Sequence, residues 1–374
     1  MLFLRNDSNY NRISDLIIEL LQIAIGHRVK LTRSLSVKEW WQLYDIAMKQ
    51  AVAGISFAGI EKLPKEQCPP QDLLFEWIGM AEQIKQRNAV VDKQTAEIWN
   101  RLKEDGLDAA VLKGQGIACE YGELAPLRQT GDIDMWVLGG YQKVCDYVQR
   151  MHPTKDVAYH RFHYDAFPDT EVELHHRPTL MRNLFDDRKL EKWYNSFKAE
   201  DFAYLEDKGF AVPSSSFNII FILTHIYRHF LFEGIGLRQV MDYYFVLKNC
   251  HTYGTDNTDV LKTLRSLRLE RFAGALMWVL HEVFGLEEEK MICPMNEKEG
   301  RFVFNEILLT GNFGQADTRY RYKRLFKLRH HISHGRHLLM HYPSEVIWTP
   351  IWLVYHKWWK WNKRCKMSEG RSKK

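Results

Sequence analysis

The sequence predicts an α+β protein, with a small β-sheet region flanked by N-terminal and C-terminal helical regions. Apolar residues recur at helical spacing through most of residues 13–104. Short strand-like segments, Gly turns and helical stretches then alternate between residues 106 and 177. From Phe217 onward the pattern is helical again. Strands confined to the middle of a chain, with runs of helix on both sides, are typical of the α+β class.

The N-terminal region is expected to consist of helices. Residues 14–26 and 36–55 carry apolar side chains at helical spacing, and each segment begins with a serine that can cap a helix. A Pro-rich connection at 62–71 leads to a long amphipathic helix from about Asp72 to Glu104. We therefore expect an N-terminal helical region at 1–100, a sheet-containing core at 101–215, and a C-terminal helical region with a basic tail at 216–374.

The core is expected to begin with a strand that ends in a Gly turn. Predicted elements follow in this order: a strand at 106–114, a short helix at 115–122, a strand at 132–137, a helix at 140–151, and extended segments at 157–167 and 170–177. In the C-terminal region, residues 217–232 are apolar nearly all round, which indicates a buried helix.

Two pairs of polar residues in that C-terminal region are each one helical turn apart. His225 and His229 lie within the apolar stretch and are predicted to be satisfied core histidines. Arg238 and Asp242 are predicted to form a structural ion pair.

Composition limits the class of protein. A hydrophobic content of 45% and a charged content of 26% are ordinary for a globular chain of 374 residues. The six cysteines form no CxxC pair, which argues against a zinc ribbon or a disulfide framework and favours a reducing compartment. The first apolar run is too short for a signal peptide, and no stretch is long enough to span a membrane. We expect a cytoplasmic protein.

Two aspartates inside an apolar run are the first chemical signal. In "TGDIDMWV", Asp132 and Asp134 project from the same face of a strand, while Ile133 and Met135 point the other way, into a core. Two adjacent carboxylates raise each other's pKa unless a cation lies between them. This pattern predicts a divalent metal site.

Further charged residues surround this pair in the sequence. The Gly turn of "LKGQG" precedes a helix, so its backbone N–H groups could hold phosphate oxygens, with Lys113 and Arg128 on either side. A third carboxylate is available in "EVELHH". Three carboxylates on neighbouring strands suit a two-metal phosphoryl or nucleotidyl transfer site.

In their order, spacing and strand context, these segments resemble the DNA polymerase β-type nucleotidyltransferase superfamily. Within it, the chain is similar to a bacterial family of uncharacterised nucleotidyltransferases. Four segments carry the resemblance, which covers most of residues 40–250: "VLKG" (111–114), "RQTGDID" (128–134), "VELHHRP" (172–178) and "THIYRHFLFEGIGLRQVMD" (224–242).

The resemblance implies a small mixed-sheet nucleotidyltransferase core and a set of site residues. Asp132, Asp134 and Glu173 would be the metal-binding and catalytic carboxylates, with Mg²⁺ or Mn²⁺ as cofactor. The NTP would be held by Lys113, Gly114 and Arg128. Two departures from the family pattern stand out: Glu173 replaces a common Asp, and Gly114-Gln115-Gly116 replaces Gly-Gly or Gly-Ser.

Glu171 is a rival for the third position. Residues 171 and 173 lie on the same strand face, so parity does not separate them, although the adjacent "LHH" favours Glu173.

The expected function is metal-dependent transfer of a nucleoside monophosphate from an NTP to an acceptor that the sequence does not identify, with pyrophosphate leaving. One alternative is a catalytically idle nucleotidyltransferase-fold module that binds a partner. Another is a metal-dependent phosphotransferase, although the H-x-D-x-x-x-x-N signature of kinases is not evident.

The C-terminal segment has its own signal. Residues 319–374 hold 15 Lys and Arg against two acids, whereas the whole chain has a net charge of only +5. Read as a helix, residues 351–361 place most of their aromatic and aliphatic side chains on one broad arc. Three interpretations remain open: packing of this arc on the helical region, contact with an anionic membrane surface, and binding of nucleic acid.

Overall fold

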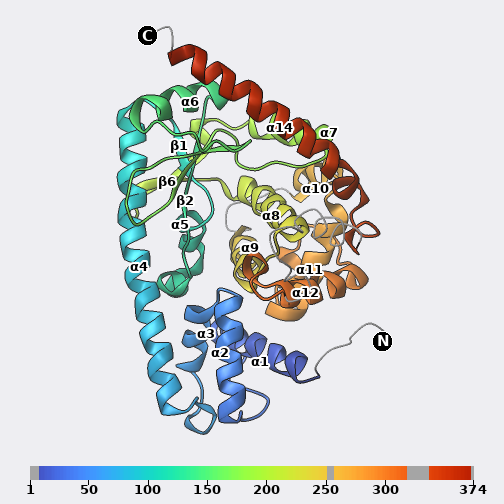
Figure 1. Cartoon of the computed structure of the whole chain (residues 1–374). Coiled ribbons are helices and arrows are strands. Elements are labelled where there is room, and N and C mark those ends of the chain that lie inside the picture. Colours follow the sequence, from blue (N-terminus) through green and yellow to red (C-terminus); the bar gives the residue numbers. More distant parts are fainter. Residues whose placement is uncertain (1–7, 251–256, 318–336, 372–374) are drawn as a thin grey trace, which may run out of the picture.

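The computed structural model describes residues 8–250, 257–317 and 337–371. A 34-residue helix, α4 (Gln71–Glu104), runs along one side of the molecule (Figure 1). The N-terminal helices lie at one end of α4 and the main sheet lies near the other end. The C-terminal helices fill the space beside both. The structure is therefore α+β, as the sequence predicts.

The N-terminal helices are α1 (Ser8–Ala24), α2 (Val37–Lys49) and α3 (Ala53–Ile60). Ser36 caps α2 as predicted: its side chain accepts the Glu39 N–H, and the Glu39 carboxylate accepts the Ser36 N–H in return. Ser14 lies inside α1 and is buried, so it is not the expected cap. The helix predicted at 36–55 is two helices, separated where Ala51 has a φ of 56°.

The main sheet is mixed and has four strands in the order β1-β2-β4-β3. Its strands are β1 (Ala109–Val111), β2 (Ile133–Val137), β3 (Arg161–His163) and β4 (Val172–His175). The central pair, β2 and β4, is parallel, and β1 and β3 are antiparallel to their neighbours. The extended segments predicted at 157–167 and 170–177 contain β3 and β4.

Alternate side chains of β2 enter different surroundings. Ile133 and Met135 are buried with residues of α4 and of α6 (Gly140–Met151), as the alternation predicts. On the other face, the ring of Trp136 stacks on Phe217 with centroids 4.9 Å apart. The acidic face of β2 is thus turned toward the helical side of the molecule.

Several elements between the sheet and the C-terminal helices had no counterpart in the prediction. These are α7 (Leu184–Tyr194) and a second, two-stranded antiparallel sheet of β5 (Phe202–Leu205) and β6 (Phe210–Pro213). Short 3₁₀ helices occur at Lys65–Gln67, Cys119–Leu127, Ala199–Asp201, Glu288–Lys290 and Asn312–Gly314, and the one at Cys119–Leu127 follows the four-residue α5 (Gln115–Ala118).

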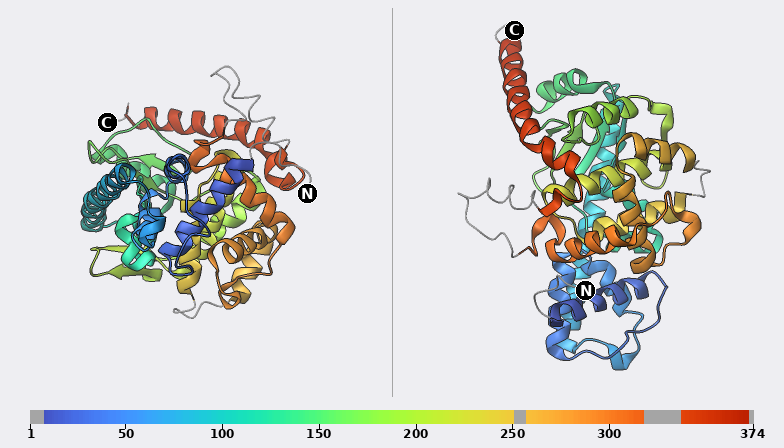
Figure 2. Two further views of the ribbon diagram at one scale, coloured as in Figure 1. Left: turned by 90° about the horizontal axis from the view of Figure 1, so that it is seen from below. Right: turned by 90° about the vertical axis from the view of Figure 1, so that its right-hand side faces the viewer.

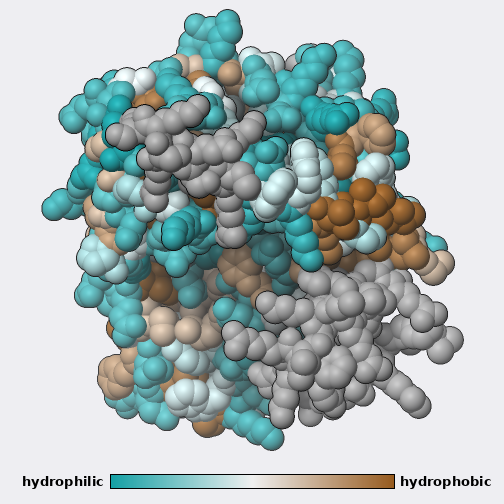
Figure 3. All heavy atoms as spheres, turned by 45° about the horizontal axis from the view of Figure 1, so that its top comes forward, coloured by the Kyte–Doolittle hydropathy of each residue, from teal (hydrophilic) through white to brown (hydrophobic). Residues whose placement is uncertain are grey.

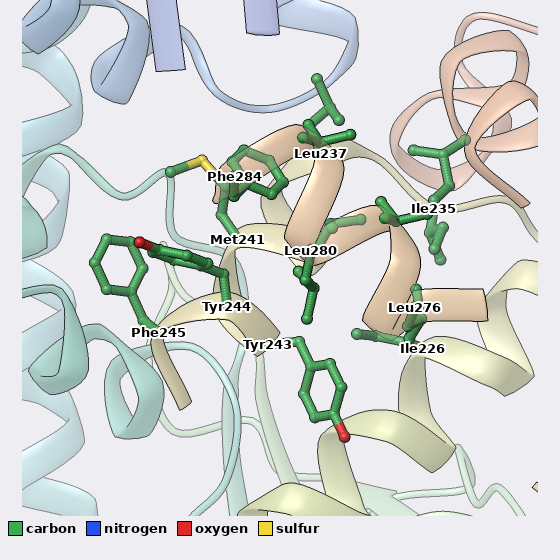
Figure 4. Packing of buried hydrophobic residues seen from close by; sticks show 14 of the residues in the cluster. Ile226, Ile235, Leu237, Met241, Tyr243, Tyr244, Phe245, Leu276, Leu280 and Phe284 are labelled. Atoms are coloured by element: carbon green, nitrogen blue, oxygen red, sulfur yellow. The ribbon is translucent and has the colours of Figure 1, made fainter. Parts of the chain in front are cut away.

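The C-terminal helices form the largest part of the core. They are α8 (Ser215–Phe232), α9 (Leu237–Cys250), α10 (Asn257–Ser266), α11 (Glu270–Phe284) and α12 (Glu297–Thr310). Residues 217–232 are a buried helix, as predicted. Figure 4 shows apolar side chains of α8, α9 and α11 packed together. The same cluster includes α1–α3, so the N- and C-terminal helices share one hydrophobic core.

The last helix, α14 (Pro343–Arg371), lies along the outside of the molecule (Figures 1 and 2). Its Glu345 carboxylate accepts the backbone N–H groups of Arg182 and Asn183 at 2.7 and 3.1 Å, which ties it to the segment before α7. No helix among the described residues combines the length and apolar character needed to cross a bilayer.

Candidate active site

The register of the parallel strands brings the predicted carboxylates together. Asp134 on β2 lies directly opposite Glu173 on β4, so both side chains leave the same face of the sheet. Asp132, which immediately precedes β2, projects from that face as well. Carboxylate oxygens of Asp132, Glu171 and Glu173 all lie within 4.8 Å of one another, as do ligand atoms of Asp134, Glu173 and His175. Glu173 belongs to both groups.

The rival carboxylate differs from Glu173 in its surroundings. Glu173 is buried and lines a cleft, whereas Glu171 is exposed and is not among the described residues that line it. Glu171 nevertheless lies close enough to Asp132 to share an ion with it. The structure therefore favours Glu173 as the residue within the cleft, with Glu171 at its edge.

Asp134 is held by the side chains of a lysine and a histidine. The Lys113 ammonium lies 2.9 Å from Asp134 Oδ1, and His175 Nε2 lies 2.8 Å from the same oxygen. Burial alone would raise the pKa of Asp134, but Lys113 and His175 outweigh it and lower that pKa. Asp134 is therefore ionised at neutral pH.

Asp132 has the opposite electrostatics. Although the Asp132 residue is exposed at the mouth of the cleft, partial desolvation, followed by the charges of Asp134 and Glu173, raises its pKa to about 6. A divalent cation among these oxygens would relieve that repulsion, and carboxylate oxygens are the ligands that Mg²⁺ and Mn²⁺ prefer. The donor set thus fits the metal that the sequence predicts.

Two neighbours of the carboxylates had no assigned role in the sequence. His175 Nε2 also lies 3.3 Å from Glu173 Oε2, and Arg161 Nη1 lies 2.5 Å from Glu173 Oε1. The signal for His175 was its position two residues after Glu173, which places it on the same strand face. Arg161 comes from β3, opposite His175, and only the strand pairing identifies it.

The turn after β1 contributes Lys113 and Gly114 to the same cleft. Gly114 has a φ of +56°, a conformation that favours glycine, and a Cβ there would approach the Asp132 carbonyl oxygen to 3.4 Å. This turn therefore lets the backbone pass close to the loop that carries Asp132.

Arg128 lines the cleft but is engaged elsewhere. Its Nε and Nη2 donate to Oδ1 and Oδ2 of Asp242 on α9, at 2.7 and 2.8 Å, and Tyr121 donates to the same carboxylate. Arg128 and Asp242 are both buried. Arg128 Nη1 is buried and has no hydrogen-bond partner among the described residues, so this one donor is left for a ligand.

The predicted pairing of Arg238 with Asp242 is wrong. Asp242 takes Arg128 as its ion-pair partner, and Arg238 Nη1 donates instead to the Gln129 carbonyl at 3.0 Å. A helix places residues one turn apart on one face, but the buried Arg128 guanidinium reaches that carboxylate with two parallel hydrogen bonds.

The histidines on α8 lie at the wall of the cleft rather than in the interior of the core. Both His225 and His229 line it, and their ring centroids are 4.3 Å apart. Burial, followed by the charge of Arg228, lowers the pKa of His229 to about 4, although Glu233 lies 2.6 Å from its Nδ1. Burial lowers the pKa of His225 as well, so both rings are neutral at physiological pH.

The cleft itself has a volume of about 490 Å³, within the range of small-molecule sites. One wall is the acidic edge of the sheet, and the opposite wall is formed by α8 and α9. All six residues predicted from the sequence line it: Asp132, Asp134, Glu173, Lys113, Gly114 and Arg128.

Comparisons with known proteins bear on what such a cleft does. No curated protein matches this chain. The chain is similar to the crystal structure of an antigenic nucleotidyltransferase-like protein from Paracoccidioides brasiliensis, with 10% identity and a TM-score of 0.30. That similarity covers 56% of this chain and 96% of the other.

A family description, "Uncharacterised nucleotidyltransferase", matches residues 36–285, which include the long helix, the sheet, every predicted site residue and helices α8 and α9. Since this match spans well over half of the sequence, the chain belongs to that nucleotidyltransferase family.

Proposed function

We propose that the protein transfers a nucleoside monophosphate from an NTP to an acceptor, with release of pyrophosphate, in a reaction that requires Mg²⁺ or Mn²⁺. The observation that carries this proposal is the meeting of Asp132, Asp134 and Glu173 at one wall of a ligand-sized cleft. Membership of a nucleotidyltransferase family supports the same reaction class.

In this proposal Asp132, Asp134 and Glu173 hold the metal. When bound, the metal neutralises charge on the phosphates and favours attack at phosphorus. Lys113 lies against Asp134 and can also contact a phosphate oxygen, while the Gly114 turn lets a phosphate approach the backbone. The buried Nη1 of Arg128 is a further donor for the triphosphate.

The proposed step forms a bond between the acceptor oxygen and the α-phosphorus. The bond from the α-phosphorus to the bridging oxygen breaks, and pyrophosphate leaves. Glu173 is the carboxylate that we assign to accept the acceptor proton, at Oε2, because Arg161 lies 2.5 Å from Oε1 whereas His175 lies farther, at 3.3 Å, from Oε2.

The test uses the purified protein, Mg²⁺, a cell extract and each of the four NTPs labelled at the α-phosphate. Transfer of α-label to a product identified by mass spectrometry, with pyrophosphate release, supports the proposal. Transfer of the terminal phosphate alone would show a phosphotransferase. Binding of NTP without any transfer would show an idle module.

The matched variant is the double substitution Asp132→Asn with Asp134→Asn, which should abolish transfer while the protein stays folded by circular dichroism. Calorimetry gives a second readout. Unchanged affinity for the metal and nucleotide in this variant would overturn the metal assignment.

A further inference from the structure

Among the described residues, helix α14 contacts the rest of the protein through one of its faces. Trp352 and Trp359 are buried, and their rings lie 6.3 and 5.1 Å from the ring of Tyr159, which precedes β3. Trp359 also meets Tyr141 of α6 at 5.7 Å. This inner face packs on the sheet-containing part of the molecule, and the single aromatic arc expected from the sequence is divided in two.

The outer face of α14 carries a second set of large apolar side chains. Their exposed fractions lie between 48% and 71%, and they are Ile347, Ile351, Val354, Trp358 and Trp361. Intervals of four and three residues place these five side chains in one continuous row along the helix. We call this row the outer stripe. Figure 3 shows a face of the molecule on which hydrophobic side chains gather in one patch.

Only positive charge accompanies the outer stripe. Residues 346–363 contain no Asp or Glu, and Lys357 is exposed. At 100° per residue, Lys357 lies along one flank of the outer stripe, and Lys360 lies farther round the helix on the same side. Five further Lys and Arg residues follow between 364 and 374, against one acid, Glu369.

We propose that the outer stripe docks on an anionic phospholipid surface, with its aromatic and aliphatic side chains in the headgroup region and its cations against lipid phosphates. Charge complementarity favours lipid over a second copy of the chain. An antiparallel pair of α14 helices joined through the stripe would set the Lys357 flanks against each other, without an acid to neutralise them. A lipid surface supplies the missing anions.

The position of α14 permits this contact. The helix follows the outside of the molecule, and its C-terminal end extends past the neighbouring elements (Figure 2). Because Trp352 and Trp359 hold the inner face, the outer stripe can enter a surface without unfolding the helix.

Co-sedimentation of the full chain with vesicles tests the proposal. Vesicles of phosphatidylcholine alone are compared with vesicles that also contain phosphatidylglycerol, at low and at high salt. We expect binding to the anionic vesicles at low salt and weaker binding at high salt. The variant Val354→Ser, Trp358→Ser, Trp361→Ser should reduce that binding by at least about tenfold.

Two further variants control the result. Val37→Ser with Phe75→Ser removes equally exposed apolar side chains elsewhere and should bind as the wild type does. Lys357→Glu should weaken binding at low salt only. Thermal unfolding confirms that each variant is folded.

Three outcomes would overturn the proposal. These are no pelleting with anionic vesicles at low salt, equal pelleting of the triple variant, and a lipid-free dimer that the triple variant abolishes. If the triple variant pellets with vesicles as the wild type does but loses binding to RNA, the outer stripe would be assigned to nucleic acid instead.

Discussion

At the scale of single residues, the two aspartates of the strand β2 segment are charged differently. Asp134 has Lys113 and His175 within 3 Å of one oxygen. Among the described residues no cation forms an ion pair with Asp132, and the charges of the nearby carboxylates outweigh that of Lys113. Without a bound metal, repulsion among the carboxylates therefore disfavours the ionised form of Asp132 more than that of Asp134.

This difference predicts a pH effect on stability. The pKa of Asp132 is raised to about 6 in the folded state, so the folded protein binds more protons than the unfolded chain between about pH 4 and 6. Stability from this group is therefore lost as the pH rises through that range. Asp132→Asn should raise the melting temperature of the metal-free protein by roughly 1–3 °C at pH 7.5 and leave it unchanged at pH 4.

Addition of Mg²⁺ provides the control for this prediction. It should stabilise the wild type at pH 7.5 and have a smaller effect on Asp132→Asn, because binding to the folded state alone raises stability. A variant that melts at a lower temperature than the wild type at pH 7.5 would contradict the assignment.

A second prediction separates the two glutamates. Glu173→Gln should lower kcat by about 100-fold or more and should raise the KM for NTP by a smaller factor. The reason is that Glu173 is the buried carboxylate that both candidate metal groups share. Glu171→Gln is the same substitution at an exposed residue, and it should change kcat by less than about tenfold. Steady-state kinetics with the reverse ranking would transfer the role to Glu171.

At the scale of elements, the buried pair of Arg128 and Asp242 joins the loop before β2 to helix α9. Two parallel hydrogen bonds link them, and Tyr121 completes the carboxylate shell. Asn88 of α4 holds the same loop by donating to the carbonyls of Pro126 and Arg128. The segment that leads into Asp132 is thus fixed from two sides.

Removal of one partner of this ion pair should strongly destabilise the folded protein. Asp242→Asn leaves the Arg128 guanidinium buried without its counter-charge and should lower the free energy of unfolding by about 3–5 kcal/mol. Asp45→Asn is the control, since Asp45 forms an exposed pair with Lys49 on α2 and should cost less than about 1 kcal/mol. Denaturant melts that give equal losses would contradict a structural role for Asp242.

Element types were more predictable from the sequence than their partners. The long helix α4 and the buried helix α8 have strong periodicity, and the face of β2 that carries Asp134 follows from alternation alone. The role of Arg161 required the register of β3 on β4, which depends on contacts between distant segments. The same reason explains why the sequence predicts an ion pair between Arg238 and its helical neighbour Asp242. The actual partner of Asp242 is Arg128, which lies 114 residues away in sequence.

At the scale of the whole molecule, the N-terminal helices touch the loop that leads to the site. Gly54 of α3 packs so closely that a Cβ there would lie 2.2 Å from the Leu127 carbonyl oxygen. Leu127 is followed directly by Arg128. The helical region that precedes the sheet is therefore part of the support of the cleft.

Substitution of this glycine tests that support. Gly54→Ala must displace α3 or the Leu127 backbone, so we expect a lower melting temperature and a fall in kcat/KM for nucleotide transfer. Gly79→Ala is the matched control, because Gly79 is an exposed helical residue with open space around it. That change should raise stability by about 0.4–1 kcal/mol. If Gly54→Ala changes neither the melting temperature nor kcat/KM, then α3 does not support the cleft.

The distance in sequence between Arg128 and Asp242 has a consequence for synthesis on the ribosome. Their separation of 114 residues corresponds to about 6–23 s of translation at 5–20 residues per second. During that interval the strands that carry Asp134 and Glu173 have been made, but the carboxylate that neutralises Arg128 and the α9 wall of the cleft have not. We therefore expect nascent chains arrested before α9 to be inactive toward NTP, so that activity begins only after most of the chain has been translated.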